Sequence, residues 1–441
     1  MAPLRRGAAL ALLALAGCAP IAPYHGPDPA PGSVRTLASA VAKRGDVDGA
    51  SRRWLVDGAR AGDSSASSPS RTGPVTVILY GDNRGGFRMQ YHTTEYRAVS
   101  RMFSSGIGGF AKGLLFTPIL LVESIIPTLD GPRDLVTLFT RNTRAGGEQR
   151  VLDAMKPLLP ADLVVSTGDV VTDGRRGVLW ESFESRHRDL RARNLYLAAP
   201  GNHERLYDPS SAAAWDAVIG TPPQPGCHWY RADLPDVGAR FVFLDSDMLA
   251  DVQGNYGDRL WAQRAEAQLD FAERELSAPS RYKFVVLHHP PVTTGHYERD
   301  WASDSAADPV PARRARLLAM CARHRVTAVL AGHEHLYYRL YVADSSGAGF
   351  WEVISGGGGA PLYPIEKGAL ERSVSSPLPG GLRVVKESAW GRSTFHFCRI
   401  TFPPDEDAVH LDVYRAESGG KAERIDQVNL AAPPPPRVPG S

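Results

Sequence analysis

Short apolar runs recur along the chain, and polar or glycine-containing segments separate them. The runs are rich in Val, Ile, Leu and Phe, and each is about as long as a strand in the core of a globular protein. Buried strands are therefore predicted at residues 75–80, 163–167, 195–199, 241–244, 284–287 and 326–330.

Stretches with the spacing of helices lie between several of these runs. Helices are predicted at residues 147–158, 177–193, 259–276 and 312–323. Later runs at 351–354, 394–402 and 409–414 have strand character and no helix between them. Alternating strands and helices that give way to strands alone predict an α/β core whose later strands form a more antiparallel sheet.

The N-terminus has the pattern of an export signal. Residues 1–6 contain arginines and no acidic residue, and residues 8–16 form a short apolar run. Such a start is typical of a secretory signal peptide, which we assign to residues 1–17. Residues 15–18 read Leu-Ala-Gly-Cys and resemble a bacterial lipobox, so Cys18 is predicted to be the lipidated first residue of the mature protein. The alternative is an ordinary signal peptide. Because Ala rather than Asp follows the Cys, an exported lipoprotein anchored in the outer membrane is expected, facing the periplasm or the exterior.

Composition then separates a predicted domain from its flanks. Residues 18–73 are rich in Pro, Ser, Gly and Ala and are expected to be a tether, with short helices at 34–43 and 52–60. The domain itself is expected at 74–416. Residues 417–441, which end in a proline run, are expected to be a disordered tail.

One apolar segment, residues 107–129 within an insertion at about 101–135, does not fit the alternation. It has the length of a membrane span, but Lys112 and Glu123 are charged and prolines interrupt it, so a span is disfavoured. Two interpretations stay open. The segment could be a helical pair packed on the core, or an apolar flap that adds a second membrane contact to the lipid anchor.

The charge balance argues against a nucleic-acid partner, and the cysteine spacing argues against a cysteine metal site. Lys and Arg total 50 against 48 for Asp and Glu, so the chain lacks the basic excess of a nucleic-acid-binding surface. Cys227, Cys321 and Cys398 have no metal-site spacing and are interpreted as structural. In an oxidising compartment they allow one disulfide, whose pairing the sequence does not decide, and one free thiol.

The candidate chemistry lies in short motifs that follow predicted strands. They are Gly-Asp-Asn-Arg at 81–84, Gly-Asp-Val-Val-Thr-Asp-Gly at 168–174, Gly-Asn-His-Glu at 201–204, Leu-His-His-Pro at 287–290 and Gly-His-Glu-His at 332–335. Most of these motifs are common when they occur alone, and Gly-His-Glu-His is less so. Because the carboxyl ends of neighbouring strands converge on one edge of a sheet, the motifs together predict a single site.

Asp, Asn and His are the ligands that suit divalent metals such as Mn, Fe and Zn. Two such ions about 3.5–4 Å apart can clamp a phosphoryl oxygen and activate a water molecule for in-line attack. Asp169 is the natural bridge between two ions, whereas His333 and His335 can serve different ions from one loop. His289 is expected to be a bystander.

The set of motifs resembles the calcineurin-like metallophosphoesterase superfamily, including members similar to purple acid phosphatases. The resemblance covers about residues 75–363 and includes 333–339 and 356–363. It implies a four-layer αββα fold, in which two mixed sheets form a sandwich flanked by helices and a two-metal site lies at strand ends. The roles it implies are Asp82 and His335 on the first ion, Asp169 as the bridge, Asn202, His288 and His333 on the second ion, and His203 as the catalytic residue that faces the phosphate.

The first motif departs from the pattern of that family, which places a metal-binding His two residues after the first Asp. This chain has Arg84 there, and arginine does not give up a proton to bind a metal. The alternative Tyr, three residues after the bridging Asp, is replaced by Thr172. The first ion is left with Asp82, Asp169 and His335. Arg84 is predicted either to bind a phosphate oxygen as a catalytic residue or to form a supporting salt bridge.

The predicted function is hydrolysis of a phosphate monoester or diester by metal-activated hydroxide at a dinuclear site. The alternative is an envelope lipoprotein that binds phosphate or metal and has lost catalysis, and Arg84 is its direct support. A zinc peptidase lacks its H-E-x-x-H motif here, and a serine hydrolase lacks its G-x-S-x-G motif. The expected partners are the substrate and, through Cys18, a membrane.

Overall fold

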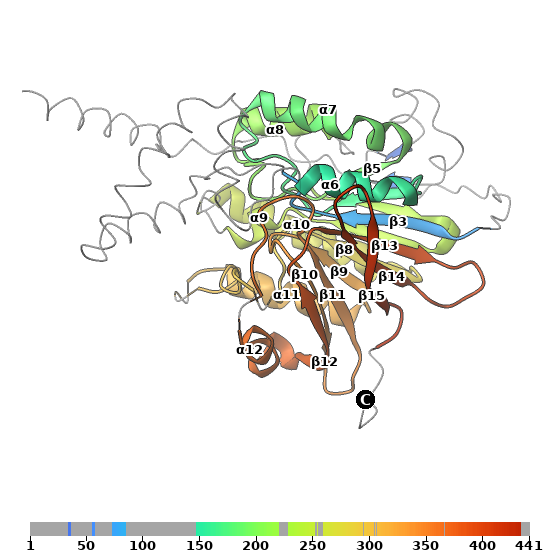
Figure 1. Cartoon of the computed structure of the whole chain (residues 1–441). Coiled ribbons are helices and arrows are strands. Elements are labelled where there is room, and N and C mark those ends of the chain that lie inside the picture. Colours follow the sequence, from blue (N-terminus) through green and yellow to red (C-terminus); the bar gives the residue numbers. More distant parts are fainter. Residues whose placement is uncertain are drawn as a thin grey trace, which may run out of the picture.

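A computed structural model of the chain describes residues 34–36, 55–57, 73–84, 147–219, 228–251, 254, 259–293, 295–303, 305, 307–365 and 367–433. Two β-sheets pack face to face within these residues, and helices cover their outer faces (Figure 1). The expected four-layer αββα sandwich is confirmed.

One sheet has the strand order β15-β14-β13-β3-β4-β5. Its strands are β3 (Val75–Tyr80), β4 (Leu163–Ser166), β5 (Tyr196–Ala198), β13 (His396–Phe402), β14 (His410–Ala416) and β15 (Ala422–Asn429). β3, β4 and β5 are parallel, whereas β13 pairs with β3 and β14 in the antiparallel sense. The carboxyl ends of the three parallel strands therefore meet at one edge.

The other sheet has the strand order β1-β2-β6-β7-β8-β9-β11-β10-β12. Its strands are β1 (Val34–Thr36), β2 (Leu55–Asp57), β6 (Tyr230–Leu234), β7 (Ala239–Phe243), β8 (Tyr282–Val286), β9 (Ala328–Ala331), β10 (Tyr337–Ala343), β11 (Gly349–Ser355) and β12 (Arg383–Arg392). β7, β8, β9 and β11 form its parallel centre, and the remaining pairs are antiparallel. Both sheets are mixed, as expected.

Helices form the two outer layers. The α-helices are α6 (Gly147–Met155), α7 (Gly177–Arg193), α8 (Pro209–Val218), α9 (Ser246–Ala250), α10 (Arg259–Ser277), α11 (Val310–Arg323) and α12 (Ala369–Ser375), and the 3₁₀ helices are η2 (Lys156–Leu158), η3 (Pro235–Val237) and η4 (Pro379–Gly381). α6, α7 and α8 pack on the sheet that contains β3, whereas α9, α10 and α11 pack on the sheet that contains β8.

The strand β3 is buried at every position, and five of its six residues are Val, Ile, Leu or Tyr. Val77 and Leu79 point into the layer between the two sheets, and Ile78 and Tyr80 point towards the helices of the outer layer. Successive side chains of a strand face opposite sides, so a strand covered on both faces needs apolar residues at every position. Each fully buried aliphatic side chain contributes roughly 1.5–3 kcal/mol.

Three sequence predictions about the flanks are wrong. Short helices were expected at 34–43 and 52–60, but β1 and β2 pair with each other and β2 extends the larger sheet through β6. The expected disordered tail at 417–441 contains β15, which pairs with β14 along its length. In each case the strand forms because a neighbouring strand supplies backbone hydrogen bonds, and the local sequence does not predict that pairing.

Several expectations fall on residues that the structure does not describe. They concern the signal peptide, the lipidation of Cys18, the apolar insertion at 101–135 and Cys227. Cys321 and Cys398 are both buried and free, so they do not pair with each other. No helix in the described ranges has the length and apolarity to cross a membrane.

Candidate metal centre

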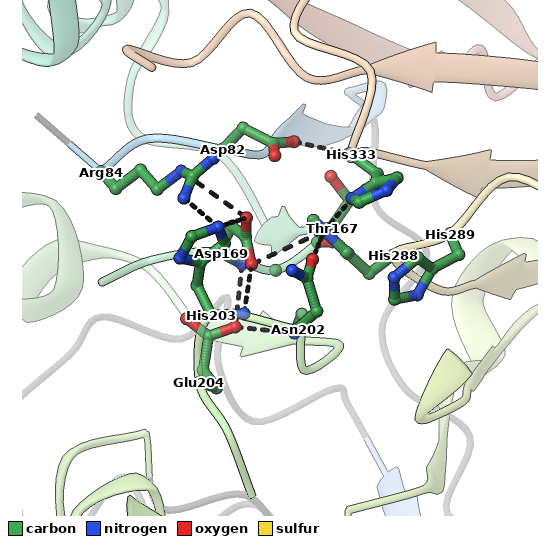
Figure 2. A network of polar contacts seen from close by, with 12 residues as sticks. Asp82, Arg84, Thr167, Asp169, Asn202, His203, Glu204, His288, His289 and His333 are labelled. Atoms are coloured by element: carbon green, nitrogen blue, oxygen red, sulfur yellow. Dashed lines mark hydrogen bonds and ion pairs between the residues drawn. The ribbon is translucent and has the colours of Figure 1, made fainter. Parts of the chain in front are cut away.

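The predicted site residues come together where the strands of both sheets end. Segments 81–84, 167–174 and 200–204 follow β3, β4 and β5, and segments 287–289 and 332–335 follow β8 and β9. Figure 2 shows their side chains converging on Asp169. The sandwich therefore brings together residues as distant in sequence as Asp82 and His333, whose backbone N–H donates to the Asp82 carboxylate at 2.8 Å.

Three of the predicted ligands have backbone conformations that residues other than glycine rarely adopt. Asp82, Asp169 and His333 have φ values of 54°, 55° and 68°. Left-handed φ values of this kind cost free energy and persist only where the surroundings impose them. Here the backbone N–H of Asp82 donates to the carbonyl of Gly168 at 2.9 Å, which ties the first two loops together.

His288 presents one ring nitrogen to the centre of the cluster. Its Nδ1 lies 2.8 Å from the carbonyl oxygen of Thr167, so Nδ1 carries the proton and Nε2 has the free lone pair. Nε2 faces Asn202 Oδ1 at 3.0 Å, His333 Nδ1 at 3.0 Å and Asp169 Oδ1 at 3.5 Å.

The ring of His333 is fixed from its other side. Its Nε2 lies 2.9 Å from Oδ2 of Asp300. Burial, followed by the charge of Glu334, raises the pKa of Asp300. When this carboxylate is ionised, it accepts the proton of Nε2 and leaves Nδ1 unprotonated. Nδ1 then joins three other acceptor atoms, from His288, Asn202 and Asp169, in one small volume. Acceptors that converge in this way repel one another unless a cation lies among them, so these four residues fit a divalent metal ion.

The two carboxylate oxygens of Asp169 face different neighbours. Oδ1 faces His288 and accepts the backbone N–H of His203 at 3.0 Å. Oδ2 lies 3.6 Å from Arg84 Nε and 3.7 Å from His203 Nε2. Asp169 therefore faces two positions in the site, one with each carboxylate oxygen, and Arg84 lies at one of them.

That second position contains Asp82, His335 and Arg84. The Nδ1 of His335 lies 2.6 Å from the carbonyl oxygen of Pro361, which directs Nε2 inward to within 3.4 Å of Asp82 Oδ1. The guanidinium of Arg84 lies within this group, with Nη2 3.0 Å from His335 Nε2 and Nη1 in close contact with His203 Nε2. All eight residues predicted for the site therefore lie in one cluster.

Comparison with known proteins gives one match to a family model. Residues 134–337 match the model of the calcineurin-like phosphoesterase family. The matched segment includes six of the eight predicted site residues, because Asp82 and Arg84 precede it. The part of the site that departs from the calcineurin-like phosphoesterase pattern is therefore also the part outside the match.

Two known proteins are similar to this chain. The chain is 28% identical over 217 residues to tartrate-resistant acid phosphatase type 5 of Sus scrofa, a match that covers 45% of this chain and 59% of the relative. The structure of a purple acid phosphatase from yellow lupin (Lupinus luteus) seeds is 16% identical, with a TM-score of 0.51, and covers 85% of this chain and 58% of the other. The chain thus spans less than two thirds of either protein, and the second likeness shows the fold alone.

Burial governs the protonation of the buried carboxylates and imidazoles in the site. It raises the pKa of Asp82 to about 7, with the charge of Asp169 adding to the rise and His288 and Arg84 opposing it. Burial, followed by the charge of Arg84, lowers the pKa of His335 to about 3. Burial and the neighbouring imidazoles also lower the pKa of His333. These histidines are neutral near pH 7, which is the state that binds a metal.

Two supporting residues were not predicted from the sequence. Asp300 was missed because it lies outside every motif. Glu204 was part of the third motif without a role, yet its carboxylate accepts the backbone N–H groups of Asp169, Val170 and Gly201 at 2.9, 2.8 and 2.6 Å. It therefore holds the loops after β4 and β5 together (Figure 2).

His289, which was expected to be a bystander, lies nearer the site than that expectation implies. Its ligand atom lies within 4.8 Å of those of His288 and His333, and the three could hold a metal ion. Its Nδ1 contacts Ser246 Oγ at 3.0 Å, so Nε2 is the atom available for a ligand. Its pKa is lowered by burial.

Aromatic rings line the site beside the imidazoles. The ring of Tyr363 stacks on His335 with the ring centroids 4.2 Å apart, and the ring of Tyr297 lies 4.0 Å from that of His333. The two hydroxyls are 3.1 Å apart. These rings limit the rotation of the imidazoles of His335 and His333 and reduce their access to water.

Proposed function

We propose that this chain hydrolyses phosphate esters in a metal-dependent reaction at the cluster around Asp169. The observation that carries the proposal is the convergence of His288 Nε2, His333 Nδ1, Asn202 Oδ1 and Asp169 Oδ1. A metal ion bound there would polarise a phosphoryl oxygen and lower the pKa of a bound water molecule.

The chain's own residues then bind and orient the phosphate. His203 keeps its proton on Nδ1, which lies 2.7 Å from the carbonyl oxygen of Thr172, and it directs Nε2 towards Arg84 and Asp169. A proton taken up at Nε2 would let His203 stabilise the charge that develops on the phosphate or protonate the leaving oxygen, and we assign it that role. Arg84 supplies positive charge beside it. The acid phosphatase named above supports a phosphate monoester as the substrate.

Turnover of the full chain tests this proposal. We would measure hydrolysis of p-nitrophenyl phosphate and of bis-p-nitrophenyl phosphate after chelation and after addition of Mn²⁺, Zn²⁺ or Fe²⁺. Activity should vanish on chelation, return with at least one metal, and be higher on the monoester. His333→Ala should abolish it, whereas His410→Ala, which removes an imidazole paired with Glu406 at the surface, should not.

The opposite result has a defined meaning. A folded chain that binds metal but hydrolyses neither compound would support the alternative in which the protein binds phosphate or metal without catalysis. That alternative predicts inorganic phosphate binding that depends on the metal, measured by isothermal titration calorimetry.

We also propose that Cys18 is lipidated and anchors the protein in the cell envelope. The Leu-Ala-Gly-Cys sequence at 15–18 supports this proposal. Mass spectrometry of the mature N-terminus should find a lipid on Cys18, and Cys18→Ser should release the protein from the membrane fraction. An unmodified Cys18 within a longer chain would contradict it.

A further inference from the structure

The contacts of Arg84 differ from those of a flexible phosphate-binding arm. The side chain is buried, and each of its three nitrogens faces a different site residue. Nε faces Asp169, Nη1 contacts His203 Nε2, and Nη2 lies 3.0 Å from His335 Nε2. A guanidinium held on three sides is a fixed positive charge.

The contact with His335 has a direct consequence for metal binding. An imidazole nitrogen has one lone pair, and because Nδ1 of His335 donates to Pro361, Nε2 is its only acceptor. That lone pair accepts a proton of Arg84 at 3.0 Å. A metal bound to the same atom would lie about 2.0–2.1 Å away and would occupy the path of this hydrogen bond. His335 cannot bind both cations.

Electrostatics leads to the same conclusion. Asp82 and Asp169 are the carboxylates that face this position, and Arg84 already lies beside both in the buried site. A divalent ion added next to a buried guanidinium would meet strong repulsion, because charges a few ångströms apart interact strongly away from water. The position that faces His288 and His333 has no such competitor among the described side chains that form it.

We infer that the guanidinium of Arg84 takes the place of one of the two metal ions, so that the centre binds a single ion through Asp169, Asn202, His288 and His333. The inference rests on the proposed function for its catalytic meaning but not for its test. In it Asp82 and His335 position Arg84 and are not metal ligands. The phosphate would then contact two positive charges, one from the metal ion and one from the guanidinium of Arg84.

Counting the bound ions tests this inference without any substrate. We would load the full chain with Mn²⁺, dialyse it, and measure manganese per chain by inductively coupled plasma mass spectrometry. The wild type should hold one ion and give the electron paramagnetic resonance spectrum of isolated Mn²⁺ rather than that of an exchange-coupled pair. Two ions per chain with a coupled spectrum would overturn the inference.

Variants test where the single ion binds and whether Arg84 prevents a second ion from binding. His333→Ala should lose the ion, and His410→Ala should keep it. Arg84→His removes the guanidinium and supplies a ligand, so this variant should bind a second ion. If a folded Arg84→His variant, checked by circular dichroism, still binds one ion, Arg84 is not what excludes the other. Should Arg84→His fail to fold, the wild-type count and spectrum still decide the main point.

The outcomes for this inference and for the proposed function are separable. One ion with no turnover would leave the count intact and contradict phosphoesterase activity. Two ions with turnover would contradict the single-ion inference and support phosphoesterase activity. With both correct, activity should follow a one-site dependence on free Mn²⁺.

Discussion

His333 is held by Asp300, with 2.9 Å between the ring Nε2 and the carboxylate Oδ2. This contact decides which nitrogen of His333 faces the centre, and residues that orient a ligand in this way typically change metal affinity ten- to a hundredfold. We expect Asp300→Ala to weaken Mn²⁺ binding by about that factor, and Asp300→Asn, which keeps an acceptor, to weaken it less. Isothermal titration calorimetry measures the affinity. Asp405→Ala, an exposed carboxylate, is the control, and an unchanged affinity in Asp300→Ala would remove its orienting role.

Gly201 allows the backbone to pass close to the bridging carboxylate. A Cβ at this position would lie 2.4 Å from Asp169 Oδ1 and 2.6 Å from the Asp169 backbone nitrogen, which is too close for any side chain. Gly201→Ala should therefore displace Asp169, lower metal affinity and destabilise the fold by about 1–3 kcal/mol. Urea unfolding and metal titration measure the two effects.

The matched control is Gly177, at the start of α7, where an added Cβ would meet no described atom within 4 Å. Gly177→Ala should change stability by less than about 0.5 kcal/mol and leave metal binding unchanged. Equal effects of the two substitutions would show that the close contact at Gly201 is not what matters.

Glu352 gives the protein a pH dependence outside the site. Burial raises its pKa from 4.5 to about 8, and the backbone N–H of Val292 donates to its carboxylate at 3.0 Å. The folded state thus keeps a proton that the unfolded state has released, so stability falls as the pH rises from about 4.5 to about 8. Urea unfolding at about pH 6 and about pH 8 should show that loss, and Glu352→Gln should reduce it. A wild type that is equally stable at both pH values would contradict the assignment.

The strand β15 is held to the other sheet by Asp426. Its carboxylate accepts the Nε of Arg339 at 2.6 Å, the Nη2 of Arg339 at 3.2 Å and the hydroxyl of Tyr337 at 2.9 Å. Asp426→Ala leaves a largely buried guanidinium without this partner, and we expect a loss of about 2–3 kcal/mol in the free energy of unfolding. Asp412→Ala, which removes a pair with the exposed Arg424, should cost less than about 1 kcal/mol. Comparable losses from both would show that Asp426 does not anchor the strand.

The sequence predicted the elements and motifs that can be identified from a short stretch of residues. The strand β3 is mostly apolar because both of its faces are covered. The helix α7 was predicted with its observed ends, 177 and 193. The site residues were also readable, because each lies within a short motif that follows a strand. Neighbouring strands of a parallel sheet end at the same edge. The convergence of such motifs can therefore be predicted without knowing the tertiary structure.

Only the tertiary structure decided how those residues are arranged. Arg84 and His335 are 251 positions apart, and nothing local to either shows that a guanidinium lies where the sequence analysis placed a metal ion. Asp300 orients His333 from outside every motif, and β1, β2 and β15 become strands because their partners offer unpaired backbone groups. These features depend on contacts between distant segments. A sequence specifies which groups are present, whereas distances and protonation states follow from what the fold places beside them.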